Sequence, residues 1–287
     1  MKMAPEWHDR LRHWTAALEK DFYHPLGEIS FEGFCTRSHI TQEEALGHGG
    51  YAPVPGGTAW GNEWEYLWLK GEIVLPPEAE GKMIVLNLNP GGETTLFVNG
   101  ASFGTYRAGW VSVPHHFIED NILTENGRPG ERYLLQAEAY AGHFFPESHV
   151  TACSTGPVIP GAYTDPLKGR LRTVMGKNTF GVWNEEAYQL WMDVKTLAEV
   201  MDCLPESSLR AAKIGKALQN FTLTVDFEQP PEARNASYRA GREVLREALS
   251  CVNGSTAPTF YGIGNAHLDV AWLWPLAETE RKVSRTF

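Results

Sequence analysis

Cysteine is scarce in this sequence. Its 287 residues include only Cys35, Cys153, Cys203 and Cys251. No two of them form a C-x-x-C pair, which excludes the usual motifs of zinc ribbons and dithiol redox centres. Few, widely separated cysteines are typical of a reducing compartment, so we expect buried, reduced thiols in a cytoplasmic protein.

Long apolar runs are also missing. No stretch approaches the roughly 20 apolar residues that a membrane-spanning helix needs. The first residues, MKMAPEWHDRLRHW, lack the apolar core of a secretory signal. We therefore expect no membrane partner and no secretion.

Positive charge is in deficit. The sequence has 25 Lys and Arg against 35 Asp and Glu, a formal net charge of −10. An acidic surface repels phosphate backbones, so nucleic acid is not an expected partner.

Glycine, proline and tryptophan are plentiful, with 28, 18 and 10 residues. This composition predicts many turns and an aromatic-rich β core. The length suffices for more than one domain, and the pattern changes character along the chain. We expect an N-terminal helical segment at 1–28, a β-sandwich at 29–183, a helical connector at 184–256 and a final segment at 257–287.

The first segment predicts one amphipathic helix over residues 5–23. Trp7, Leu11, Trp14 and Leu18 fall at i, i+4, i+7 and i+11 and so share one face. We expect this face to dock against a core.

The region 29–183 predicts an antiparallel sandwich. Its start, up to about residue 60, is irregular and rich in loop signals. Alternating segments then follow at turn-bounded intervals, and Asn99-Gly100 is a strong hairpin signal. The expected strands are 65–75, 82–88, 94–98, 101–106, 110–113, 132–140 and a last one within 171–182.

Two residue groups in this region leave a choice. Trp60, Trp64 and Trp68 could stack on a sugar, but core packing is the expectation because aromatics dominate small sandwich cores. The histidines at 115, 116, 143 and 149 have no companion ligands at a suitable spacing, so we interpret them as loop residues.

The region 184–256 predicts three helices. Asn184 and Ser207 or Ser208 are suitable N-caps for the first two helices, and the third is expected over 232–251. Between the second and the third, the apolar residues 221–227 suggest a short strand or an extended linker. We interpret the helices as a connector.

The last segment holds the most specific pattern. Tyr261-Gly262-Ile263-Gly264 resembles a buried strand. His267 and Asp269 follow two residues apart, so both would point to one side of an extended chain. An imidazole and a carboxylate are ligands that a zinc-type ion accepts. A helix then begins near Pro275, with Glu278 and Lys282 spaced to pair at i and i+4.

The string His267-Leu-Asp269-Val-Ala-Trp272-Leu-Trp-Pro275, followed by Glu278-Thr and Arg281-Lys, resembles the opening of the catalytic domain of family 38 glycoside hydrolases. These are zinc-dependent retaining α-mannosidases, and the long cytosolic or vacuolar type is the most similar. The middle region is similar to the galactose-binding-like jelly roll, on residues 66–69, 75–76, 96–100 and Gly104.

The resemblance implies a function. His267 and Asp269 match the first two ligands of zinc or another divalent metal, and Trp272 matches an aromatic residue of the sugar subsite. The chain would be the N-terminal part of an enzyme that hydrolyses terminal α-mannosides of oligosaccharides, ending in the first strand and helix of an incomplete (β/α) barrel.

The resemblance also implies what is missing. The nucleophile, the acid/base residue and the last metal ligand lie farther along the family's barrel, so we expect this chain to be inactive by itself. Two ligands fall short of the usual three or four, so we expect no tight zinc binding here. We expect the orphaned strand and helix either to pack poorly or to lean on the sandwich. The strand could also pair with another copy of the chain.

The alternative is a non-catalytic carbohydrate-binding sandwich. In that case the last 30 or so residues would complete the fold, and the chain would bind oligosaccharide unaided.

Overall fold

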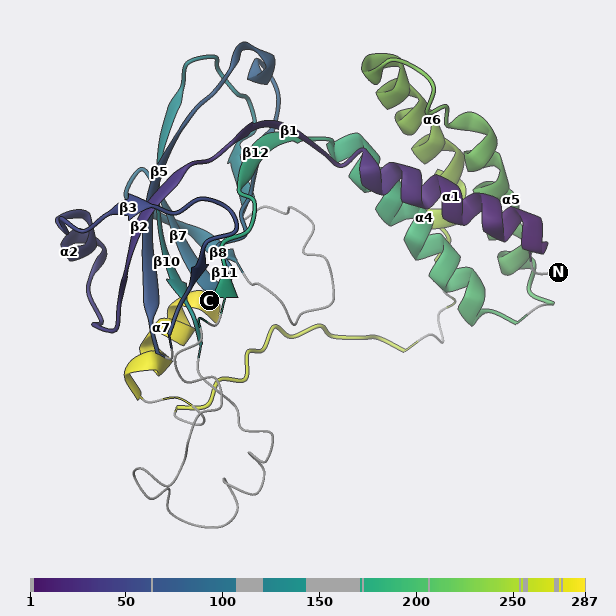
Figure 1. Ribbon diagram of the computed structural model, residues 1–287. Coiled ribbons are helices and arrows are strands. Elements are labelled where there is room, and N and C mark those ends of the chain that lie inside the picture. The colour runs from purple at the N-terminus through teal and green to yellow at the C-terminus, as the bar shows by residue number, and fades with distance from the viewer. Residues whose placement is uncertain are drawn as a thin grey trace. The chain divides into compact units, whose positions relative to one another are not determined.

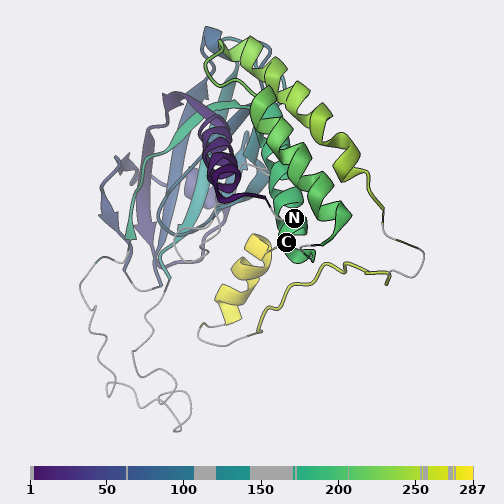
Figure 2. The same cartoon turned by 90° about the vertical axis from the view of Figure 1, so that its right-hand side faces the viewer.

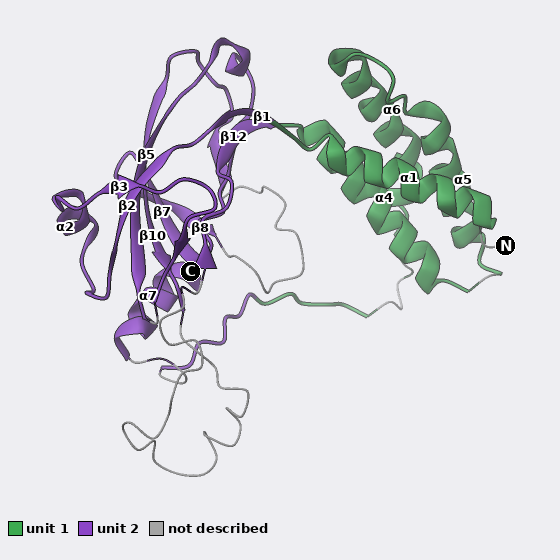
Figure 3. Cartoon of the chain, in the orientation of Figure 1, with its two compact units in different colours: residues 1–24, 183–263 green, residues 25–182, 264–287 purple. Residues whose placement is uncertain are grey.

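The computed structural model describes residues 3–62, 64–106, 121–142, 171, 173–205, 207–252, 254, 258–270, 274 and 276–286. The chain divides into two compact units (Figure 3). One, the helical unit, combines residues 1–24 with 183–263; the other, the sandwich unit, combines residues 25–182 with 264–287. The domain boundaries expected from the sequence stay a prediction.

The sandwich unit is built on β-strands that form two larger sheets and one small one (Figure 1). The strands are β1 (Tyr23–Glu28), β2 (Phe31–Thr36), β3 (Ala52–Pro53), β4 (Ala59–Trp60), β5 (Tyr66–Val74), β6 (Ile84–Asn87), β7 (Glu93–Val98), β8 (Ala101–Tyr106), β9 (Ile122–Thr124), β10 (Arg132–Tyr140), β11 (Thr173–Val174) and β12 (Thr179–Trp183). The six-stranded sheet has the order β3-β2-β5-β10-β7-β8, the four-stranded sheet has the order β1-β12-β6-β9, and β11 pairs with β4. The mixed β and α fold with an antiparallel sandwich is confirmed.

The core of the sandwich comes from the side-chain alternation of its strands. Leu67, Leu69 and Ile73 of β5 point to one face of the sheet, and all three are buried. They share a hydrophobic cluster with Leu86 of β6 and Leu135 of β10. The opposite face of β5 is not polar, because Tyr66 and Trp68 are buried there too. Both faces of the central strands are therefore covered.

The hairpin signal is confirmed. Asn99 and Gly100 connect β7 to β8 with φ values of 50° and 84°, the left-handed conformation that this two-residue turn requires. The Asn99 side chain also accepts a hydrogen bond from the backbone N–H of Leu134 at 2.9 Å. The turn is thus tied to β10, the strand next to β7.

The region before residue 60 is more ordered than expected. It contains β2, β3, β4 and the short helix α2 (Gln42–Leu46). Thr41 caps α2 in a capping box with Glu44. The T-x-x-E signal was present in the sequence. The interpretation of this region as irregular was therefore wrong.

The described residues of the helical unit form the helices α1 (Pro5–Lys20), α4 (Glu185–Cys203), α5 (Leu209–Thr224) and α6 (Pro231–Leu249). In Figure 2 α4, α5 and α6 lie side by side. Asn184 and Ser208 cap α4 and α5 by accepting hydrogen bonds from Ala187 and Ala211. The predicted helices at 5–23, 184 onward and 232–251 are confirmed within a few residues.

One part of the helical unit differs from expectation. Residues 221–224 continue α5, where a strand or linker was predicted. Phe221 is fully buried, on the same face as Leu218 and Ile214. The helical period therefore continues through the segment, and burial of Phe221 outweighs the β-branched composition around it.

Asp21 is a buried polar centre of the helical unit that the sequence pattern did not reveal. Its carboxylate accepts a hydrogen bond from the Tyr238 hydroxyl at 2.8 Å and one from the Asn184 amide at 3.2 Å. Arg234 forms an ion pair with it at 3.1 Å, and Nε2 of His24 lies 3.0 Å from it. A buried carboxylate needs this degree of compensation.

The described cysteines differ from the expectation of buried thiols. Cys35, Cys203 and Cys251 are free and exposed, so the expectation of buried thiols was wrong for them. Cys153 lies outside the described residues, as do the strand expected at 110–113 and the histidines at 115, 116, 143 and 149. No helix in the described part of the chain is long and apolar enough to cross a membrane.

Candidate functional site

The segment that precedes the predicted metal ligands is not a strand. Residues 258–269 have no regular secondary structure. Phe260, Tyr261 and Ile263 are 89, 85 and 86% exposed, so the prediction of a buried strand at 261–264 was wrong. A parallel strand needs neighbours that accept and donate its backbone hydrogen bonds. Among the described residues no strand pairs with this segment.

His267 and Asp269 nevertheless come together. The Nε2 atom of His267 lies 3.5 Å from Oδ1 of Asp269, with side chains 86 and 44% exposed. Two donors on one tetrahedral zinc ion, each about 2.0–2.1 Å from the metal, lie roughly 3.3 Å apart. The pair therefore fits two corners of such a site. Within the described residues, no group of three or more potential ligands is present.

Trp272 lies outside the described residues. Hydrogen bonds connect the described residues before and after it. The indole N–H of Trp274 donates to the Thr279 hydroxyl at 3.0 Å. That hydroxyl donates to the backbone carbonyl of Val270. The residue that follows Asp269 is thus bonded to the helix α7 (Leu276–Thr286).

Helix α7 rests on the sandwich, in contact with β7 and β8, and its ion pairs reach residues of β7 and β10. Arg281 pairs with Glu138 of β10 at 2.5 Å, and Lys282 pairs with Glu93 of β7 at 3.2 Å. Arg285 also reaches Glu93, at 3.3 Å. The expectation that this helix could lean on the sandwich is confirmed. The expected pairing of Lys282 within its own helix is replaced by a bond to the sheet.

Glu278 is the most deeply buried charged group of this contact. It is fully buried, accepts a hydrogen bond from the Tyr66 hydroxyl and pairs with Arg285. Burial, and then the bond to Glu278, raise the pKa of Tyr66 far above its ordinary value. Burial raises the pKa of Glu138 as well, against the attraction of Arg281 and Arg285. Carboxylates, cations and a tyrosine thus share one desolvated interface.

Sequence reasoning missed this interface, although a signal existed. Along β10, Glu138 has the parity of Tyr140 and faces away from the core residues Ala137 and Ala139. An acid beside large aromatics on the supposed solvent face indicates a covered face. The basic residues at 281, 282 and 285 are spaced to share one side of a helix.

Trp60 and Trp68 pack in the core of the sandwich unit, as expected from the sequence. Trp60 is 3% exposed, and its N–H donates to the carbonyl of Pro90 at 2.8 Å. Trp68 is 2% exposed and packs with Phe34 and Ala45 beneath α2. Trp64 is only partly buried, with a φ of 63°. Trp60 and Trp68 therefore offer no face to a sugar.

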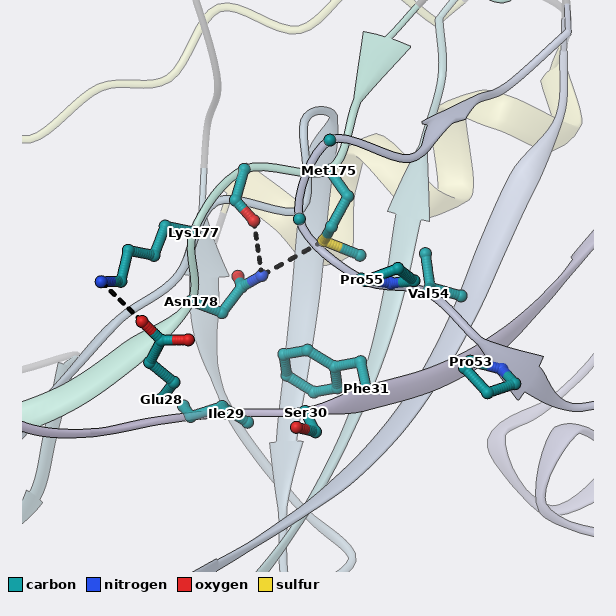
Figure 4. A pocket seen from close by; sticks show the side chains of 13 residues that line it. Glu28, Ile29, Ser30, Phe31, Pro53, Val54, Pro55, Met175, Lys177 and Asn178 are labelled. Carbon is teal, nitrogen blue, oxygen red and sulfur yellow. Dashed lines mark hydrogen bonds and ion pairs between the residues drawn. The ribbon is translucent and has the colours of Figure 1, made fainter.

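A pocket of about 510 Å³ opens on the sandwich unit (Figure 4). Glu28 and Lys177 form an ion pair at 2.6 Å beside it. The Asn178 amide is already used, because it donates to the Met175 sulfur at 3.2 Å and to the carbonyl of Gly176 at 3.1 Å. This pocket has the size for a small ligand, but its best-placed polar group has no spare donor.

Residues 28–152 match the family model described as the jelly roll domain of α-mannosidase, Ams1-like. This part of the chain is similar to the jelly roll domain of α-mannosidases. Together with the similarity of the longer relatives below, this match confirms the resemblance to α-mannosidases.

Similarity to α-mannosidases extends over nearly the whole chain. The α-mannosidase of Saccharomyces cerevisiae is 31% identical over 97% of this chain and 23% of its own length. Alpha-mannosidase 2C1 of Mus musculus is 22% identical over 96% of this chain and 26% of its own length. The chain thus spans about a quarter of the length of these relatives. Among solved structures, a β-glucuronidase from Ruminococcus gnavus matches 57% of this chain and 29% of its own, with 18% identity and a TM-score of 0.32.

Proposed function

We propose that this chain forms the N-terminal part of an α-mannosidase that hydrolyses terminal α-mannosides of oligosaccharides. The observation that carries the proposal is the coverage of 96–97% of the chain by proteins named α-mannosidase. That coverage includes the segment with His267 and Asp269. A relationship confined to the jelly roll would have left this segment unmatched.

In this proposal the chain supplies part of a metal site. His267 and Asp269 would hold zinc or another divalent ion, together with ligands from outside this chain. Their separation of 3.5 Å suits two donors to one ion. The bound metal would hold hydroxyls of the mannose at the cleaved bond. Trp272 would line the sugar subsite, and catalysis would proceed with retention through carboxylates that this chain does not identify.

The chain's residues have a defined task in such a site. Asp269 is the less exposed of the pair, and its carboxylate lies within reach of the His267 imidazole. The atoms that face each other, Nε2 of His267 and Oδ1 of Asp269, are the two that would bind the ion. The pair would therefore present one nitrogen and one oxygen donor to the same point.

The experiment measures release of an aryl leaving group from an aryl α-mannoside. It uses this chain alone and, where the reading frame continues past Phe287, the longer product. We expect the longer product to be active, and to lose activity both with a chelator and in the His267→Ala variant. The matched control is His13→Ala, an exposed histidine remote in sequence from the metal segment.

Two results would contradict the proposal. A longer product inert toward α-mannosides would favour the carbohydrate-binding sandwich. Activity that survives both the chelator and the His267→Ala substitution would remove His267 from the site.

A further inference from the structure

Helix α7 is held by charge more than by apolar contact. Its sequence, LAETERKVSRT, contains few large apolar residues, and Leu276 and Val283 are 62 and 41% exposed. Its cations are nevertheless covered, since the Arg281, Lys282 and Arg285 side chains are only 18, 14 and 5% exposed. Buried cations persist only where counter-charges are placed for them.

The sandwich groups that α7 contacts include two carboxylates, Glu93 and Glu138, and the Tyr66 hydroxyl. Tyr66 belongs to β5, Glu138 to β10 and Glu93 to β7, and these strands are consecutive in the sheet order. In the strand register, Tyr140 of β10 lies opposite Tyr66 of β5 on one side and Glu93 of β7 on the other. Tyr66, Tyr140 and Glu93 therefore form one patch on the outer face of the sheet. We call the patch formed by Tyr66, Glu93, Glu138 and Tyr140 the α7 seat. Because it lies on paired central strands, it is a rigid docking surface.

Aromatic rings complete this seat. Arg281 lies 5.0 Å from the ring centroid of Tyr66, and Arg285 lies 5.3 Å from that of Tyr140. The two tyrosine rings stack on each other at 5.1 Å. Cations over aromatic faces in a desolvated contact add to the ion pairs. These ring contacts and the ion pairs together hold α7 in one position on the sheet.

The metal segment depends on this helix for its own position. Residues 258–267 are exposed, and among the described residues the charged side chain near the His267 ring is Asp269. The nearest fixed point is Val270, whose carbonyl accepts a hydrogen bond from Thr279 in the first turn of α7. Lys282 also lies 4.8 Å from the ring centroid of Trp274.

We infer that Tyr66, Glu93 and Glu138 of the jelly roll are positioning residues that hold the His267–Asp269 segment in place through α7. The jelly roll is then not a passive strut, because it orients one side of the metal site. The metal role of the segment rests on the proposed function; its attachment to the sheet does not.

The test measures the position of the segment directly. Nitroxide labels are placed at Ala266→Cys and Leu134→Cys, two exposed sites of the sandwich unit, after the four native cysteines are replaced by serine. Pulsed electron paramagnetic resonance then gives the distance distribution between the labels. With the helix seated, we expect one narrow peak.

The decisive variant is Arg281→Glu, which places a carboxylate against Glu138. We expect loss of the narrow peak and a broad distribution. The charge-swapped double variant, Glu138→Lys with Arg281→Glu, restores opposite charges and should restore the peak. Arg132→Glu is the matched control, because it reverses one partner of the exposed Arg132–Glu72 pair on the same sheet and should leave the peak unchanged.

A peak that stays narrow in Arg281→Glu overturns the inference, and so does equal broadening in Arg132→Glu. Circular dichroism of each variant shows whether the sandwich is still folded. The distances need no catalytic activity. A protein inert toward α-mannosides therefore overturns the proposed function, whereas an unmoved segment overturns this inference alone.

Discussion

Asp21 and Tyr238 show how single residues stabilise the helical unit. The two are 217 positions apart, and no local pattern links them. The sequence predicted the helix that carries Tyr238, and the side chain is fully buried. It did not reveal that the hydroxyl has a charged partner, because that partner comes from the far end of the chain.

Removal of this hydroxyl should destabilise the helical unit. A hydrogen bond to a charged group contributes about 1.5–3 kcal/mol. Asp21 keeps its contacts with Asn184 and Arg234, so we expect Tyr238→Phe to lower the free energy of unfolding by about 2 kcal/mol. Chemical denaturation followed by circular dichroism measures this change. The control is Tyr261→Phe, at a residue 85% exposed, which should change almost nothing; equal effects in both variants would refute the prediction.

Glu138 should give the sandwich unit a distinctive pH dependence. Burial raises its pKa above the ordinary 4.5, while Arg281 and Arg285 oppose the shift and Glu278 adds to it. A folded-state pKa above the unfolded one means that the folded state takes up a proton first as the pH falls. Stability from this group is therefore complete below about pH 4.5 and is lost as the pH rises through the folded pKa.

The measurement compares wild type with Glu138→Gln, which cannot titrate. As the pH is lowered from 7, we expect the free energy of unfolding of the wild type to rise relative to that of the variant. Glu72→Gln, at the exposed pair with Arg132, is the control and should show no such relative gain. A wild type that loses stability relative to Glu138→Gln over this range would show that the ion pair outweighs desolvation.

At the scale of elements, the sequence was informative wherever the pattern is local. The segment 132–140 was expected as a strand and forms β10 with the same bounds. The Asn99-Gly100 turn and the caps at Asn184 and Ser208 were also found. Each depends on neighbours within a few positions, so the sequence contains the whole signal.

The elements that were missed depend on distant contacts. Residues 221–224 were expected to be extended, yet packing of Phe221 in the helical unit extends α5 through them. The strand at 261–264 was expected from its apolar, glycine-bounded composition. A strand exists only with a partner strand, and composition cannot supply one.

The candidate site divides in the same way. The motif placed His267 and Asp269 together, and the structure has them 3.5 Å apart. The sequence signal at Glu138 indicated a covered face of β10, but it did not indicate that α7 covers it, because the ion pairs join residues 143 and 189 positions apart. Charged residues on separate elements can be recognised as ion pairs only when the fold that brings those elements into contact is known.

At the scale of the whole molecule, the two units are each discontinuous in sequence. The chain runs from one unit into the other at residues 24, 182 and 263, yet each unit is compact and has its own buried residues. A domain with its own core can unfold by itself. Segments that are adjacent in sequence but belong to different units can therefore unfold at different times.

We expect destabilisation of one core to stay within its unit. Leu69 of the sandwich and Leu218 of α5 are both fully buried, so replacement of either by alanine should cost about 2–5 kcal/mol. Leu69→Ala should accelerate hydrogen exchange in β5, β7 and β10 and leave α4, α5 and α6 protected. Leu218→Ala should do the reverse, which makes the two variants controls for each other. Equal acceleration in both units by either substitution would mean that the chain unfolds as one cooperative body, and the division into two units would then describe packing but not stability.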